Sequence, residues 1–279
     1  MARRSTGFRA RRTRPAAIPG GVAGRRVALN ARDRWTREVR SCGRVVVRRI
    51  LPGAIERMAI EVETKDCTAL SDAELAEMAD ICVDGPSRFE VGLLSKQTEA
   101  WVLVTLAREG RSLKAFSFST LERIGGTPAV LIGLASVRRT SKRDSVMRAI
   151  MAEQYRRAVL AFPDEDVLVG TRIINAGGFE ALRALDDIVP RPDHRASGEE
   201  RAWGRRLAKR FGVETGNYND RDFTAVGDGA FPLVLDHDTL KPENLDVDVV
   251  AIFDKTNAKR GDSVIVFGWA MAERLAKLG

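Results

Sequence analysis

The chain has 279 residues, of which 44% are hydrophobic and 30% charged, a composition typical of globular proteins. It contains no apolar run of the roughly 18 residues that a membrane-spanning helix needs. Its three cysteines include no Cys-x-x-Cys pair, which excludes a disulfide framework and a cysteine-based zinc ribbon. We therefore expect a reducing compartment, the cytoplasm. Only two histidines are present, so we expect neither a histidine-rich metal site nor a Ser-His-Asp hydrolase.

The positive charge is concentrated at the N-terminus. Residues 1–60 contain 16 arginines, no lysine and 3 acidic residues, a net charge of +13. Because the whole chain carries +8, residues 61–279 carry −5. Residues 1–57 have too few apolar side chains to offset the entropy of ordering, so we predict a disordered basic tail. It could bind nucleic acid or be a cleaved targeting peptide. The interpretation that we favour is a dispensable tail, or a leader translated from upstream of a true start at Met58.

The first half of the remaining chain predicts two helices and a run of strands. A short strand is expected at 59–62. Ser71 and Glu74 form a capping-box pattern that starts a helix ending near residue 85, and a second short helix is expected at 88–96. Apolar runs at 101–106, 113–120 and 130–137 are separated by short turns, which predicts an antiparallel meander with both faces covered.

The second half alternates between the two kinds of pattern. Apolar residues from Met147 to Val159 recur at helical spacing, so a helix is expected from about Ser145 to Pro163. Strands are expected at 167–174, 233–235, 247–253 and 263–269, and helices at 179–185, at 198–211 and at the C-terminus. The predicted fold class is α/β (α+β), with a mixed, mostly antiparallel twisted sheet flanked by helices. Neither Gly-x-Gly-x-x-Gly nor a P-loop motif occurs, which disfavours those two kinds of nucleotide site.

The junction from Arg138 to Asp144 carries chemical information. It holds four basic side chains and two hydroxyls between a predicted strand and the start of a predicted helix. A helix N-terminus offers unpaired N–H groups and a positive dipole end, and both favour an anion. The sequence therefore predicts a phosphate site. The alternative is a solvated basic turn in which Asp144 or Ser145 simply caps the helix.

With this junction in place, residues 60–270 resemble the GNAT superfamily of acyl-CoA N-acyltransferases in element order. The resemblance implies that residues 58–279 form one GNAT-like domain that moves an acyl group from a coenzyme A thioester, or from an acyl carrier protein, to a primary amine by direct attack. It also implies that the loop after the fourth strand holds the pyrophosphate, that the fourth strand pairs with pantetheine, and that an Asn after the fifth strand helps to hold the cofactor. These positions correspond to Arg139, Thr140, Ser141, Lys142, Arg143 and Ser145 for the loop, to Leu134, Ala135, Ser136 and Val137 for the strand, and to Asn175.

The sequence departs from the family pattern at two places. No glycine occurs from Arg138 to Arg148, and Phe179 stands where many members have a tyrosine that protonates the leaving thiolate. Phenylalanine cannot donate a proton, so no catalytic residue is assigned. A non-catalytic protein that binds an acyl thioester, and a nucleic-acid-binding protein acting through the tail, are therefore kept as alternatives.

Three acidic residues and one tripeptide are interpreted as structural. The acidic residues Glu122, Asp186 and Asp187 are interpreted as surface carboxylates and not as a general base. Residues 236–238, which read Asp-His-Asp, are interpreted as a surface turn and not as a metal site.

Overall fold

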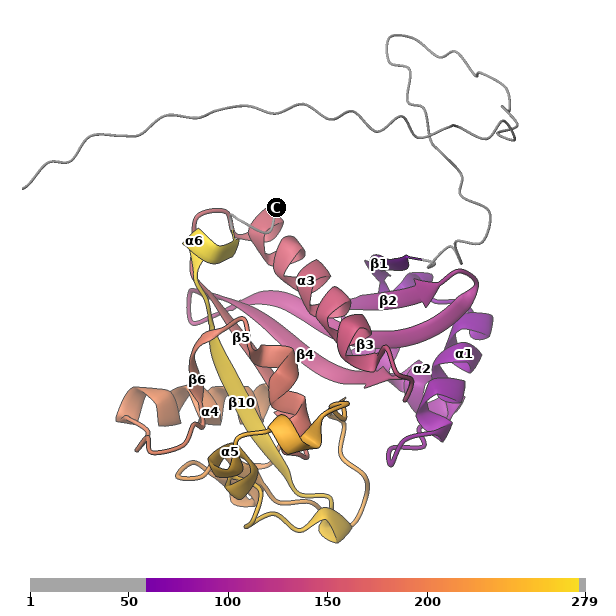
Figure 1. Ribbon diagram of the computed structural model, residues 1–279. Coiled ribbons are helices and arrows are strands. Elements are labelled where there is room, and N and C mark those ends of the chain that lie inside the picture. Colours follow the sequence, from indigo (N-terminus) through magenta and orange to yellow (C-terminus); the bar gives the residue numbers. More distant parts are fainter. Residues whose placement is uncertain (1–58, 276–279) are drawn as a thin grey trace, which may run out of the picture. The chain divides into compact units, whose positions relative to one another are not determined.

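The structure is a computed structural model that describes residues 59–275 (Figure 1). The predictions for the tail at 1–57 and for a start at Met58 concern residues outside this range. All structural statements below refer to the described residues.

Ten strands form one mixed sheet, as predicted. In chain order they are β1 (Ile60–Asp66), β2 (Leu103–Glu109), β3 (Ser112–Ile124), β4 (Thr127–Val137), β5 (Val167–Ile173), β6 (Asp186–Val189), β7 (Tyr218–Asn219), β8 (Thr224–Ala225), β9 (Leu235–Asp236) and β10 (Ser263–Ala270). The order across the sheet is β1-β2-β3-β4-β5-β10-β8-β7, with β6 paired to β10 and β9 paired to β4. Only the β4–β5 and β4–β9 pairs are parallel. The predicted meander is therefore confirmed as β2, β3 and β4.

Helices cover both faces of the sheet (Figure 1). They are α1 (Asp72–Val83), α2 (Val91–Ala100), α3 (Arg143–Ala161), α4 (Gly198–Arg210), α5 (Val247–Ala251) and α6 (Ala272–Leu275), with 3-10 turns η1 (Cys67–Ala69), η2 (Ala176–Leu182), η3 (Thr215–Asn217), η4 (Pro242–Asn244) and η5 (Ala258–Arg260). On β3, Ser117 faces α3, where it accepts a hydrogen bond from Gln154. Its neighbours Phe116 and Phe118 point the other way, into the core under α1 and α2.

The α4 side of β5 is the face opposite α3. Gly170 on β5 lies against Leu207 of α4, at a position where an added Cβ would be 3.1 Å from a Leu207 methyl group. Thr171, the next residue, points to the other face because side chains alternate along a strand. The two faces of β5 are therefore distinct environments, with α3 on one and α4 on the other.

Several predicted boundaries are corrected. The segment 247–253, predicted as a strand, begins as helix α5, because the Asp246 side chain caps it by accepting the Asp248 N–H. The predicted capping box at Ser71 and Glu74 is confirmed. Helix α3 starts two residues before the predicted Ser145, α2 is shifted to 91–100, and the predicted helix 179–185 is the 3-10 turn η2.

Strands β4 and β5 part halfway along β4. They are paired only from Ala129 to Ile132, although β4 continues to Val137. At this point the register between β3 and β4 shifts, which leaves Gly133 and Leu134 as a β-bulge in β4. A bulge bends its strand and disrupts pairing locally. The free edge of β4 beyond Ile132 is thus available to another partner, and it leads to the start of α3.

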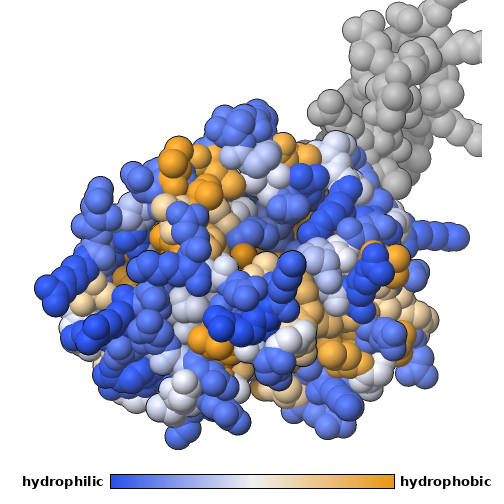
Figure 2. Space-filling model, turned by 90° about the horizontal axis from the view of Figure 1, so that it is seen from below, coloured by the Kyte–Doolittle hydropathy of each residue, from blue (hydrophilic) through white to orange (hydrophobic). Residues whose placement is uncertain are grey.

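Among residues 59–275 no helix has the length and apolar character needed to cross a bilayer. On the face shown in Figure 2, apolar side chains lie in separate groups among hydrophilic ones.

Candidate functional site

Some backbone N–H groups of the turn before α3 are already hydrogen-bonded within the turn. Lys142 is the N-cap, and its side chain makes no capping bond. The N–H groups of Arg143 and Ser145 donate to the carbonyls of Thr140 and Lys142, at 3.1 and 2.9 Å. Two of the amide donors predicted to face an anion are therefore already bonded to backbone.

Residues 233–241, here called the covering segment, lie along the free edge of β4. The Ala135 N–H donates to the Val234 carbonyl at 3.1 Å, and β9 pairs in parallel with β4 at Ala135 and Ser136. The resemblance placed the pantetheine arm of a thioester donor on this same edge. In this structure the chain itself occupies that position.

The covering segment also forms hydrogen bonds with Arg139 and Arg143, the two arginines that were predicted to bind phosphate. The fully buried Asp236 carboxylate accepts from Arg139 at 3.2 Å and from the Ser87 hydroxyl at 3.4 Å. The Arg143 guanidinium donates to the backbone carbonyls of Asp238 and of Thr239, the latter at 2.7 Å. A carboxylate and carbonyl oxygens thus fill the place predicted for a diphosphate.

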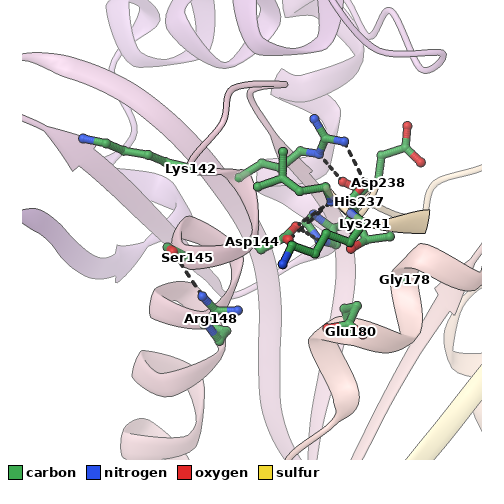
Figure 3. A network of polar contacts seen from close by, with 12 residues as sticks. Lys142, Asp144, Ser145, Arg148, Gly178, Glu180, His237, Asp238 and Lys241 are labelled. Atoms are coloured by element: carbon green, nitrogen blue, oxygen red, sulfur yellow. Dashed lines mark hydrogen bonds and ion pairs between the residues drawn. The ribbon is translucent and has the colours of Figure 1, made fainter. Parts of the chain in front are cut away.

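Asp144 contacts the C-terminal part of the covering segment. Its carboxylate accepts from the Leu240 N–H at 3.3 Å and lies 3.3 Å from Nε2 of the buried His237 (Figure 3). The His237 ring nitrogens have no well-formed hydrogen bond among the described residues. Burial lowers the pKa of His237 below its ordinary value, although the nearby Asp144 charge opposes this. At neutral pH the ring is therefore uncharged.

Two glycines allow the covering segment to pack closely. A Cβ added at Gly85 would be 2.8 Å from the Asp236 carboxylate, and one at Gly177 would be 3.0 Å from the Thr239 nitrogen. Both distances are shorter than or at the limit of normal contact, so the segment fits here only because these positions lack side chains.

The remaining predicted residues are not gathered at the same point. Lys142 forms an ion pair with Glu109, away from the covering segment. The Ser145 hydroxyl accepts from Arg148 at 3.1 Å on the outer surface of α3 (Figure 3), and Ser141 is exposed. The other two contribute to local turns: the Thr140 hydroxyl accepts from the Lys142 N–H, and the Asn175 side chain caps η2 by accepting from the Gly178 N–H. The structure thus brings together the end of β4, Arg139 and Arg143.

No described residue stands out as a proton donor or base. Glu122 forms an ion pair with Arg210, and Asp186 forms one with Arg274 at 3.0 Å. Phe179 packs edge-on against Phe253, with ring centres 6.1 Å apart. The Tyr155 hydroxyl is buried and directed at a backbone carbonyl.

The interpretation of Asp236, His237 and Asp238 as a surface turn was wrong. Asp236 and His237 are buried, and only Asp238 is exposed. The apolar residues just before them and the arginine-rich loop 138–143 are the signals that could have suggested a buried, ion-paired segment. Among residues 59–275 no group of three or more His, Cys, Asp or Glu side chains is placed to hold a metal ion.

Comparisons with known proteins give matches in structure only. No protein-family profile matches the sequence, and no curated protein is significantly similar to it. Solved structures that match include the ribosomal-protein-S18-alanine N-acetyltransferase from Escherichia coli, at 9% identity and a TM-score of 0.41, over 76% of this chain and 95% of that one. A Bacillus subtilis acetyltransferase in complex with CoA matches at 11% identity and a TM-score of 0.33, over 76% and 100%.

A third match is the aminoglycoside 6'-N-acetyltransferase from Enterococcus faecium, at 11% identity and a TM-score of 0.33. That match covers 42% of this chain and 64% of the enzyme, less than two thirds of its length. All three of these solved structures are acetyltransferases by name.

Proposed function

We propose that the chain is a divergent GNAT-type N-acyltransferase, and that its acyl thioester donor binds along the free edge of β4. The observation that carries this proposal is the separation of β4 from β5 after Ile132. The freed edge runs directly to Arg139 and Arg143 at the start of α3. A strand edge supplies hydrogen-bonding partners for an extended amide-containing arm, and guanidinium groups bind phosphate in two-pronged fashion.

On this proposal the covering segment imitates the donor. Its backbone bonds Ala135 as a pantetheine amide would, and the Asp236 carboxylate bonds Arg139 as a phosphate would. The two cannot be present together. The donor must therefore displace residues 233–241 before it binds, and the measured donor affinity includes the cost of that displacement.

The chemistry asked of the protein is modest. The nitrogen lone pair of a neutral amine attacks the thioester carbonyl, the carbon–sulfur bond breaks, and the ammonium proton is passed to the leaving thiolate directly or through water. The chain would contribute alignment of the two reactants and backbone N–H groups of β4 to polarise the carbonyl. Neither contribution needs a tyrosine at position 179.

A second candidate is a protein that binds an acyl thioester, from coenzyme A or from an acyl carrier protein, without turnover. It is favoured by Phe179 and by the closed covering segment. The nucleic-acid alternative rests on residues 1–60 alone and predicts binding that weakens steeply with salt and disappears on truncation. A cytoplasmic location is part of the proposal, since the chain's cysteine usage suits a reducing compartment.

The test is coenzyme A binding by the full chain, by Asp236→Asn and by the control Asp254→Asn, which changes an exposed carboxylate. Asp236→Asn weakens the grip of the covering segment on Arg139 while keeping its shape. We expect it to bind coenzyme A roughly 10–100-fold more tightly than the unmodified chain, since hydrogen bonds to charged groups are worth about 1.5–3 kcal/mol. Asp254→Asn should match the unmodified chain.

Turnover is then measured as free thiol released from acyl-CoA in the presence of a panel of amines. Thiol release that depends on the amine supports the acyltransferase. Binding without release supports the second candidate. If neither the unmodified chain nor Asp236→Asn binds coenzyme A, the donor site along β4 is refuted.

A further inference from the structure

A cavity of about 440 Å³ lies beside the end of β5. Its lining includes Arg172 of β5, the acidic residues Glu214 and Asp228, and the apolar residues Val213, Phe231 and Leu233. Its volume lies within the range of small-molecule sites. Because Arg172 follows Gly170 by two residues, its side chain is on the α4 face of β5, opposite α3.

The cavity adjoins the point where β4 and β5 part. Thr171 is the last residue of β5 paired with β4, and Arg172 is the next residue. Leu233, which lines the cavity, is the first residue of the covering segment, and its neighbour Val234 accepts the bond from Ala135 of β4. A ligand in this cavity would therefore approach the free edge of β4 from the face opposite the loop before α3.

Among the described residues, the side-chain partner of Arg172 is a neutral hydroxyl. Its Nε and Nη2 donate to the Ser263 hydroxyl at 3.1 and 2.9 Å, and no carboxylate among residues 59–275 lies within ion-pair distance. Burial lowers the pKa of Arg172 to about 10, so the side chain still carries its charge at neutral pH. Three of its five N–H donors have no hydrogen-bond partner among the described residues.

The nearby carboxylates do not neutralise this charge. Asp262 adjoins Ser263 but is fully committed to Arg260, to the Gly227 N–H and to the Asn257 N–H. Glu214 and Asp228 also line the cavity, but both residues are exposed to solvent and neither makes an ion pair with Arg172. A half-buried guanidinium is stabilised by a planar anion, and a carboxylate matches its geometry.

We propose that this cavity binds a small organic carboxylate with an apolar body, held by Arg172 and packed against Val213 and Phe231. If the proposed acyltransferase function also holds, this ligand is the amine acceptor, and the acceptor is then an amino-acid-like compound. That second statement rests on the proposed function. The first does not.

The experiment measures binding to the full chain by calorimetry, without any acyl donor. The probes are phenylalanine and leucine, their carboxamides, which lack the carboxylate, and 3-phenylpropionate, which lacks the amine. We expect phenylalanine, leucine or both to bind and the matching amides to bind roughly 10–100-fold more weakly, the range for hydrogen bonds to charged groups. Equal binding of acid and amide, or no binding of any carboxylate, overturns the proposal.

Variants separate a ligand-binding role from a structural one. Arg172→Gln should lose the preference for acid over amide, and Arg172→Lys should keep part of it because the positive charge remains. Ser263→Ala removes the hydroxyl that holds Arg172 but leaves its charge, so it should retain the preference. If Arg172→Gln fails to fold, the comparison of Arg172→Lys with the unmodified chain decides the matter. A preference unchanged by either Arg172 substitution overturns the assignment.

The outcome is independent of the donor site. Carboxylate binding without coenzyme A binding would refute the proposed function and leave this inference standing. The opposite result is that coenzyme A binds and thiol release depends on the amine, but amino acids and their amides react equally well. That result would support the proposed function and refute this inference.

Discussion

Gly133 is the residue at which the bulge of β4 meets the neighbouring helical layer. A Cβ built there would be 2.1 Å from the Trp101 indole, which is itself held by a hydrogen bond from its Nε1 to Gln97. The indole is a large rigid group and cannot move by that much without repacking. The absence of a side chain at position 133 is therefore what allows the bulge and Trp101 to occupy the same place.

We predict that Gly133→Ala lowers the free energy of unfolding by about 1–3 kcal/mol, the usual cost of overpacking. The matched control is Gly92→Ala in α2, where an added Cβ meets nothing within 4 Å and alanine is the better helix former. The control should be neutral or slightly stabilising in urea denaturation. Equal effects of the two substitutions would contradict the packing described for Gly133.

At the scale of a single element, the covering segment links stability to pH through His237. The ordinary pKa of this side chain is 6.5, and burial lowers it in the folded chain. Between the two values the unfolded chain binds a proton that the folded chain does not, so the free energy of unfolding falls as the pH drops below 6.5. Burial is the main cause of the lowered pKa; the charge of Arg143 lowers the pKa further, and the charges of Asp144, Asp238 and Asp236 raise it.

The corresponding variant is His237→Asn, which lacks the titrating group. We expect its unfolding free energy to fall less steeply than that of the unmodified chain between pH 6.5 and about 5. Urea denaturation at a series of pH values measures both slopes. Parallel curves would show that His237 is not buried in its neutral form.

The sequence was informative about elements wherever periodicity was strong. The capping box at Ser71, the meander ending at Val137 and the helix after it were predicted because each is encoded locally. The helix at 247–251 was missed because its start depends on Asp246, a capping signal that a run of apolar residues obscured. The local sequence predicts an element most reliably where its apolar periodicity and its capping residues indicate the same structure.

The candidate site was only partly predictable, because its central feature is a long-range contact. The sequence predicted Arg139 and Arg143 as phosphate-binding cations after this strand, and the structure places both beside the end of β4. The partner of Arg139, Asp236, lies 97 residues further along the chain, and the local pattern does not say which part of the molecule a buried segment there would contact. Arg172 was also missed, since an arginine within an apolar strand gives no sign of whether a counter-ion faces it.

At the scale of the whole molecule, our prediction is that the basic residues 1–57 are not needed for the remainder to fold. Among residues 59–275, the buried members of the two hydrophobic clusters, one under α1 and α2 and one around α3 and α4, all follow Asp66, and Ile60 and Val62 of β1 pack against the second cluster. We predict that deleting residues 1–57 leaves a soluble protein that unfolds in one cooperative transition, with a midpoint close to that of the full chain. Calorimetry of both chains measures this. An insoluble or gradually melting product would show that the remainder does not fold alone.

The most direct test of the donor site follows the covering segment in the full chain. If the donor replaces the covering segment, coenzyme A must release residues 233–241 from β4 and Arg139. Amide hydrogen exchange of the full chain, with and without saturating coenzyme A, follows this segment directly. We predict faster exchange in residues 235–240 and unchanged or slower exchange at Ala135 when coenzyme A is bound. Coenzyme A that binds while the covering segment keeps its protection would contradict the account.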